Sequence, residues 1–198
     1  MRAFKYKIGW LLLIMLLFAG CASIEKAEAL HRQGEKQAAL EMAISLLEDD
    51  SSKVRLRAVK LIGKIGGPKA GPALHQRLGE EDARVRREVV RNLGKVKYEP
   101  AIEDLADLVP DSSADMVRAL ADAFKAYGKT GIDLIVSRYD SPSQSSNRGA
   151  YKDLMIAVGP EIADSISKLL KGRSFFEIRD TFVILRGIKN PRVEIGRA

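Results

Sequence analysis

A motif that recurs about every 31 residues is the feature that most constrains how this chain folds. Residues 82–94, DARVRREVVRNLG, align with residues 51–63, SSKVRLRAVKLIG. The same step reaches three more divergent copies, and the position of Val85 is filled in the other copies by Val54, Met116, Asn147 and Ile178. A fixed period of roughly 20 to 50 residues indicates supersecondary units stacked on one another. The sequence therefore predicts a solenoid.

Each copy begins with a predicted amphipathic helix. The spacing of four places Val85, Val89 and Leu93 on one stripe, and equivalent residues recur in the other copies. We expect these first helices at residues 52–65, 83–96, 114–127, 145–158 and 175–188. Gly and Asn tolerate the left-handed conformation at a helix end. The residues expected to end these helices are Gly66, Lys97, Gly128, Gly159 and Asn190.

A second helix is expected to complete each pair. Proline suits the first turn of a helix, and the expected starts carry Pro72, Pro100 and Pro160. The acidic residues predicted to cap the following first helices are Asp50, Asp82 and Asp111. Residues 24–49 predict a further helical hairpin, whose spacing resembles that of one tetratricopeptide hairpin. We expect this hairpin to cap the N-terminal end of the array.

The first residues of the chain resemble a bacterial secretory signal. A basic segment, 1–7, precedes the unbroken apolar run 8–18, which is shorter than the about 20 residues that span a bilayer. Residues 17–21, LFAGC, are similar to the lipobox of bacterial lipoproteins, with Phe18 where that family usually has Leu. This resemblance implies cleavage between Gly20 and Cys21 and acylation of Cys21. An uncleaved N-terminal membrane anchor is the alternative.

The lipobox resemblance also implies a domain organisation and a subcellular location. Cys21 is the only cysteine, which favours a dedicated role for it. Ala22 rather than Asp after the cysteine implies, by the same resemblance, sorting to the outer membrane of a Gram-negative cell, facing the periplasm. The expected segments are a cleaved signal at 1–20, the lipidated cysteine with the hairpin cap at 21–49, and the repeat array at 50–198.

The repeats resemble the HEAT-like repeats first described in phycobilisome bilin lyases. The residues that carry this resemblance are Val54-Arg55, Val85-Arg86, Ile62-Gly63, Leu93-Gly94 and Asp82. It covers about residues 50–190 and is weaker in later copies, where Val117 replaces an expected Arg and Asn147 an expected Val. The resemblance implies an all-α solenoid with a ladder of arginines and acidic turn residues between repeats. By that resemblance the structural arginines are Arg55, Arg86, Arg148 and Arg179.

The charge of the chain argues against nucleic acid as a partner. The formal net charge is +7 at pH 7. Three of the 33 basic residues lie in the first twenty positions, which hold no acidic residue, so the rest of the chain has 30 basic and 26 acidic residues. These charges are interspersed, whereas a groove for a polyanion is uniformly basic.

The sequence lacks the motifs of metal sites and common catalytic sites. His31 and His75 are the only histidines, and no HExxH, CxxC, GxSxG or Gly-rich phosphate loop occurs. Some HEAT-like proteins are di-iron hydroxylases with repeated His-Glu pairs, which are missing here. We therefore expect no catalytic residue, metal or cofactor.

Protein binding is the function that this composition favours. Solenoids present a long concave surface lined by their second helices, and the outward polar residues predicted there are Gln76, Glu103, Asp107, Arg138 and Lys168. A second candidate surface, for docking or self-association, is the apolar C-terminal edge, with Phe176, Val183 and Ile184. A C-terminal tail that folds back over this edge is the alternative.

The sequence thus predicts a lipid-anchored, non-enzymatic scaffold or accessory subunit with an unidentified protein partner. Two alternatives stay open. One is an enzyme or maturation factor related to the bilin-lyase HEAT-like proteins. The other is a structural lipoprotein that contacts the cell wall or anionic lipid.

Overall fold

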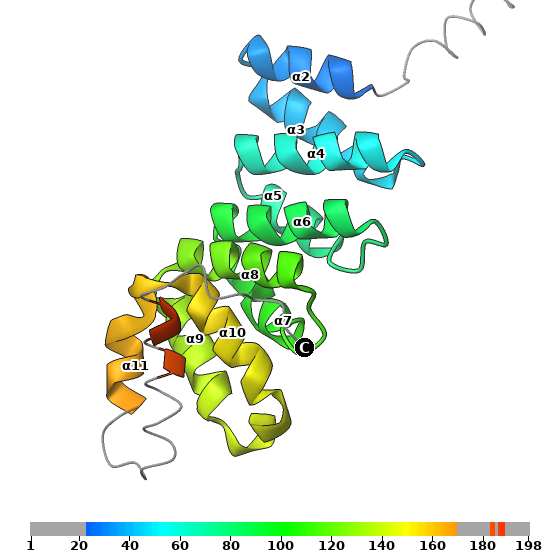
Figure 1. The fold of residues 1–198 in the computed structure, drawn as a ribbon. Coiled ribbons are helices and arrows are strands. Elements are labelled where there is room, and N and C mark those ends of the chain that lie inside the picture. Colours follow the sequence, from blue (N-terminus) through cyan, green and yellow to red (C-terminus); the bar gives the residue numbers. More distant parts are fainter. Residues whose placement is uncertain (1–22, 170–182, 185, 189–198) are drawn as a thin grey trace, which may run out of the picture.

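The structure is a computed structural model of the chain, and it describes residues 23–169, 183–184 and 186–188. These residues form an elongated stack of helical hairpins (Figure 1), as predicted for an all-α solenoid. The α-helices are α2 (Ile24–Arg32), α3 (Lys36–Ser45), α4 (Ser52–Ile65), α5 (Ala70–His75), α6 (Ala83–Val96), α7 (Ile102–Asp107), α8 (Ala114–Tyr127), α9 (Lys129–Asp140), α10 (Arg148–Val158) and α11 (Ala163–Leu169). The 3₁₀ turns are η1 (Leu46–Glu48), η2 (Glu99–Ala101), η3 (Pro142–Asn147) and η4 (Pro160–Ile162).

The helices form two rows. The first helices of successive pairs lie side by side, so that α6 packs between α4 and α8, and α8 packs on α10 (Figure 1). The second helices form the other row, in which α5 contacts α3, and α9 contacts α7 and α11. The N-terminal hairpin of α2 and α3 stacks on α4 in the same manner.

The predicted apolar columns form the core. Ile62, Leu93, Phe124 and Met155 occupy equivalent positions on successive first helices, and each side chain is fully buried. The neighbouring column of Ala58, Val89, Leu120 and Tyr151 is buried as well. Because each repeat buries these residues against its neighbours, the core runs along the whole stack instead of lying at one centre.

Glycines set the distance between neighbouring first helices. A Cβ on Gly94 of α6 would lie 2.5 Å from the Cα of Ala123 on α8. A Cβ on Gly63 of α4 would lie 1.9 Å from Oδ1 of the buried Asn92 on α6. The Ile62-Gly63 and Leu93-Gly94 pairs thus combine a core residue with a point of close backbone approach.

The predicted helix ends are confirmed for the described copies. Gly66, Gly128 and Gly159 have positive φ angles of 69°, 69° and 85°. Lys97 takes the left-handed conformation at the end of α6, with φ of 51°.

The predicted helix starts hold only in part. Asp82 caps α6, where its side chain accepts hydrogen bonds from the backbone N–H of Arg84 and Val85. The predictions that Asp50 caps α4 and Asp111 caps α8 were wrong. Ser51 is the N-cap of α4, and Ser113 caps α8 by accepting a hydrogen bond from the backbone N–H of Met116. The fourth first helix begins at Arg148, because a 3₁₀ turn that starts with Pro142 occupies residues 142–147.

Two predicted segments lie outside the described residues: the apolar leader and most of the fifth first helix. Within residues 23–169 and the short stretch near 186, no helix has the length and apolar character to cross a membrane.

We expect the substitution Gly94→Ala to lower the free energy of unfolding by about 1–3 kcal/mol or more, because the added methyl meets backbone atoms of α8. Gly149→Ala is the matched control, since a Cβ there meets nothing within 4 Å in the first turn of α10. Alanine at that position is expected to stabilise by about 0.5–1 kcal/mol. Denaturant unfolding measures the free energy of unfolding of both variants. Equal changes in the two would contradict the close approach of Gly94 to the backbone of α8.

Candidate functional site

A buried carboxylate, Glu80, lies at the turn between the second and third hairpins. Its side chain is 1% exposed. Arg55 of α4 donates Nε to Oε2 over 3.0 Å and Nη2 to Oε1 over 2.8 Å, and Arg77 donates Nη2 to Oε2 over 2.7 Å. The backbone N–H of Asp82 also donates to it. The hydrogen bonds from Arg55, aided by Arg77, lower the pKa of Glu80 to about 2 against the penalty of burial.

This cluster is the ladder that the family resemblance implied, with a different acid. Arg55 also donates to the carbonyl oxygens of Asp49 and Asp50, and Arg86 donates to the carbonyl oxygen of Glu80 over 2.9 Å. Asp82, the predicted acidic member, instead pairs with Arg84 and caps α6.

The ladder does not continue in the same form. Arg148 lies over the ring of Tyr139, with 5.9 Å between its Cζ and the ring centroid. Arg179 is outside the described residues.

Three of the five predicted binding residues of the second helices come together at Arg138. Arg138 of α9 donates Nη2 to Glu103 over 2.6 Å, and its Nη1 lies 3.2 Å from Asp107; both acids are on α7. Glu103 and Asp107 are 60% and 62% exposed, whereas Arg138 is 25% exposed. The guanidinium is thus partly covered, and the two carboxylates remain available to a partner.

The other predicted residues of this surface lie apart from that triad. Gln76 is exposed and lines a separate hollow of about 390 Å³ beside Arg55 and Arg77. The side chain of Lys168 is outside the described set. Ala106, next to Asp107, is buried, and its carbonyl oxygen accepts a hydrogen bond from the Tyr151 hydroxyl over 3.1 Å.

Asp107 also lines a groove of about 410 Å³ between two successive inter-repeat turns. Its apolar residues are the buried Met116 and the half-buried Leu78 and Leu108. Its charged residues include Arg86, Arg87, Asp107 and Asp111. An apolar base with a rim of both charges is the composition of a protein–protein contact. The sequence could not reveal this groove, because residues some 30 positions apart form it.

The C-terminal edge is described only in part. Val183 is 46% exposed, whereas Ile184 is fully buried, so only Val183 of this pair lies at the surface. Phe176 lies outside the described residues. Docking through this edge stays a prediction.

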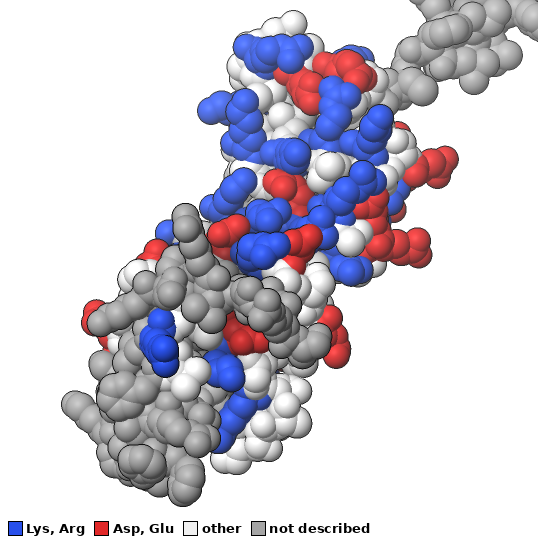
Figure 2. Space-filling model, viewed as in Figure 1, with Lys and Arg blue, Asp and Glu red and all other residues white. Residues whose placement is uncertain are grey.

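A basic hollow between α2 and α4 was not predicted. Its volume is about 270 Å³, and its charged and polar residues are Glu28, His31, Arg32, Arg57, Lys60 and Lys64. Figure 2 shows that Lys and Arg side chains gather over the neighbouring α4 and α6. The available signal was α4 itself, which contains five basic residues and no acidic one.

In the described part of the chain, no group of three or more His, Cys, Asp or Glu is placed to hold a metal ion.

Stacked hairpins of two helices define an α-solenoid, and the family comparison agrees. The profile of the HEAT repeats matches residues 27–125, which is half of the chain. The chain therefore belongs to the HEAT-repeat family.

Two solved structures are similar over most of their length. One is a chain of the complex of CpcE and CpcF of phycocyanin lyase from Nostoc sp. PCC7120, with 22% identity, 83% of this chain and 70% of that chain covered, and a TM-score of 0.47. The other is a crystal structure of an engineered protein, with 18% identity, coverage of 86% and 85%, and a TM-score of 0.39. No curated protein matches the sequence.

We expect Glu80→Gln to lower the free energy of unfolding at pH 7 by about 3 kcal/mol, because two partly buried arginines lose their counter-charge. The pKa of Glu80 is about 2 when folded, against an ordinary value of 4.5. Its contribution is therefore complete above about pH 4.5 and falls as the pH drops toward 2.

Denaturant unfolding between pH 7 and pH 3 measures this effect. The wild type should lose more stability than Glu80→Gln over that range. Glu48→Gln is the matched control, because Glu48 also pairs with Arg77 but is 76% exposed, and a loss of at most about 1 kcal/mol is expected. Equal losses for the two variants would contradict a buried ion cluster at Glu80.

Proposed function

We propose that this HEAT-repeat protein is a lipoprotein, anchored through acylated Cys21 in the outer membrane and facing the periplasm, that acts as a non-enzymatic scaffold for a partner protein. The proposal of an anchor is supported by the sequence of the leader, in which LFAGC at 17–21 follows a basic segment and an apolar run. Several acyl chains on one cysteine would hold the chain firmly, since each buried CH₂ contributes about 0.8 kcal/mol.

The groove beside Asp107 is the observation that carries the scaffold proposal. It combines the apolar side chains of Leu78, Leu108 and Met116 with charges of both signs. The triad of Arg138 with Glu103 and Asp107 adjoins it through Asp107. A partner segment with an apolar side chain for the base and a basic group for the carboxylates would match this surface.

Site-specific photo-cross-linking in native membranes tests this proposal. A photoreactive residue replaces Asp107 in one variant and Arg118 in the control. Both positions are exposed, at 62% and 57%, but Arg118 of α8 is not among the residues that line the groove. One dominant protein product at Asp107, absent at Arg118, is the expected result. Glu103→Lys, which reverses the charge of a carboxylate proposed to meet the partner's basic group, should lower its yield about tenfold, the equivalent of about 1.4 kcal/mol.

Other outcomes would assign the binding to another surface or favour another function. The same products at Asp107 and Arg118 would contradict a specific groove. A product from a probe at the exposed Val183 would assign docking or self-association to the C-terminal edge. A chromophore that absorbs visible light in the purified protein would favour the bilin-lyase-related alternative, and salt-sensitive sedimentation with cell walls would favour the structural one.

A further inference from the structure

We propose that the basic hollow between α2 and α4 binds the phosphate of an anionic phospholipid headgroup, so that the N-terminal hairpin lies against the membrane in which the chain is anchored. The proposal rests on the lipid anchor proposed above. It concerns a different surface from the groove beside Asp107.

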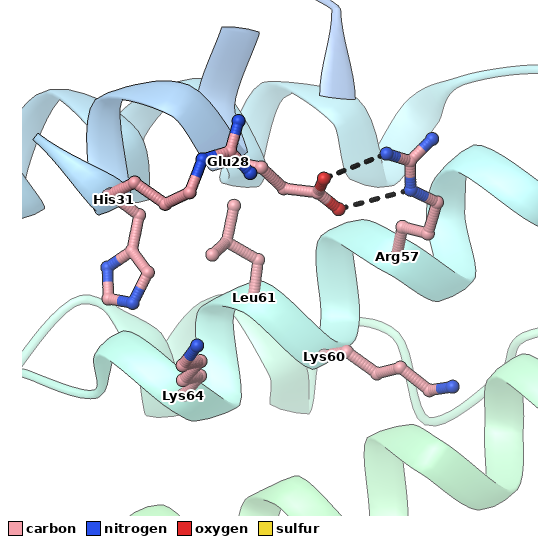
Figure 3. Close-up of a pocket in the computed structure, with 7 residues that line it drawn as sticks. Glu28, His31, Arg57, Lys60, Leu61 and Lys64 are labelled. Atoms are coloured by element: carbon pink, nitrogen blue, oxygen red, sulfur yellow. Dashed lines mark hydrogen bonds and ion pairs between the residues drawn. The ribbon is translucent and has the colours of Figure 1, made fainter. Parts of the chain in front are cut away.

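The hollow holds positive charge that the protein itself does not neutralise. Arg57 is paired with Glu28 over 2.9 Å and with Glu25 over 2.5 Å. Among the residues that the structure describes, Arg32, Lys60 and Lys64 have no ion pair, although they line the same hollow. Figure 3 shows Lys64 of α4 pointing toward α2. The Lys60 side chain lines the hollow but extends away from His31 and Lys64 (Figure 3). Cations without partners that line one concavity from two helices are complementary to an anion with several oxygens.

His31 provides a second observation at the same place. Its ring points from α2 toward α4 beside Leu61 (Figure 3). Its Nδ1 is buried and, within the described part of the chain, has no hydrogen-bond partner. Buried polar atoms in native proteins nearly always have a partner. A phosphate oxygen in the hollow would accept a hydrogen bond from this nitrogen when it carries a proton.

The length of chain before α2 points to the membrane as the source of the phosphate. Ser23 caps α2, and Cys21 stands only two positions before it. Two residues span at most about 7 Å. The helix α2 has 9 residues, so it is about 13 Å long, and the hollow lies along its C-terminal half. Acyl chains on Cys21 would therefore hold this surface close to the lipid headgroups.

The surrounding surface has the sign that a headgroup layer attracts. Lys and Arg side chains cover much of α4 and α6 on the face that adjoins the hollow (Figure 2). Clusters of basic residues beside a membrane anchor favour anionic lipids. A lipid anchor combined with a basic surface supplies two membrane signals on one molecule.

The two histidines make the test specific. Full-length protein with isotope-labelled histidine, kept in nonionic detergent, gives one set of ring signals for His31 and one for His75. His75 is the internal control, because it is paired with Asp104 over 2.6 Å on the second-helix side. Monomeric dihexanoyl phosphatidylglycerol is titrated at constant ionic strength. The expected result is a saturable shift of the His31 signals with His75 unchanged, and a much smaller response to dihexanoyl phosphatidylcholine.

Matched variants test the cations. The double variant Lys60→Gln, Lys64→Gln should bind phosphatidylglycerol about tenfold more weakly or worse. Lys97→Gln, Lys152→Gln removes the same charge from later repeats and should bind as the wild type does. An unchanged melting temperature in both shows that neither effect comes from unfolding.

Three results would overturn the proposal. One is no shift at His31, or the same shift at His75. Another is equal binding of inorganic phosphate and phosphatidylglycerol, which would make this a site for free phosphate. The last is tighter binding of an acidic peptide, which would make it a protein contact. Each is separable from the scaffold proposal, because the purified protein contains no partner and the groove beside Asp107 plays no part in the titration.

Discussion

The burial of each hairpin's apolar face on the next hairpin is the interaction on which this structure depends. Leu93 and Phe124 are fully buried because helices stand on both sides of them. Gly94 allows α6 to approach the backbone of α8, which would be impossible with a larger residue. Since such a core is continuous along the stack, the surfaces that remain for function are the edges where repeats meet.

These edges differ in how far their charged side chains are paired within the protein. At the turn between the second and third hairpins, the buried Glu80 pairs with Arg55 of α4, and on the second helices Arg138 pairs with two exposed acids. On the first-helix side, Lys60 and Lys64 have no such partner in the described chain. One protein thus presents a mixed-charge groove suited to a protein and a basic hollow suited to an anion, at different places along the stack. An anchor at Cys21 would place the second beside the membrane and leave the first free.

The period of the sequence was sufficient for the fold, because one helical stripe repeated at a constant spacing determines both the core and the stacking. Individual capping and pairing residues were harder to predict from the sequence. Ser51 and Ser113 occupy the N-cap positions where Asp50 and Asp111 were expected, since the N-cap is the residue directly before the first turn and these acids lie one and two residues before it. Glu80 replaced Asp82 as the partner of the ladder, a choice that depends on how the turn folds. The basic hollow joins residues of two hairpins, so the basic residues of α4 indicated only one of its two sides.

Both the proposed scaffold role and the membrane contact of α2 depend on the anchor at Cys21, which the intact mass of the protein purified from membranes tests most directly. A lipoprotein anchored in this way gives a chain that starts at Cys21 and carries the added mass of a diacylglycerol group and an amide-linked acyl chain. Cys21→Ser should abolish both the acyl mass and the cleavage after Gly20. A wild-type chain that retains residues 1–20, or one cleaved elsewhere without acyl groups, would contradict the lipoprotein account and remove the reason for placing α2 at the membrane.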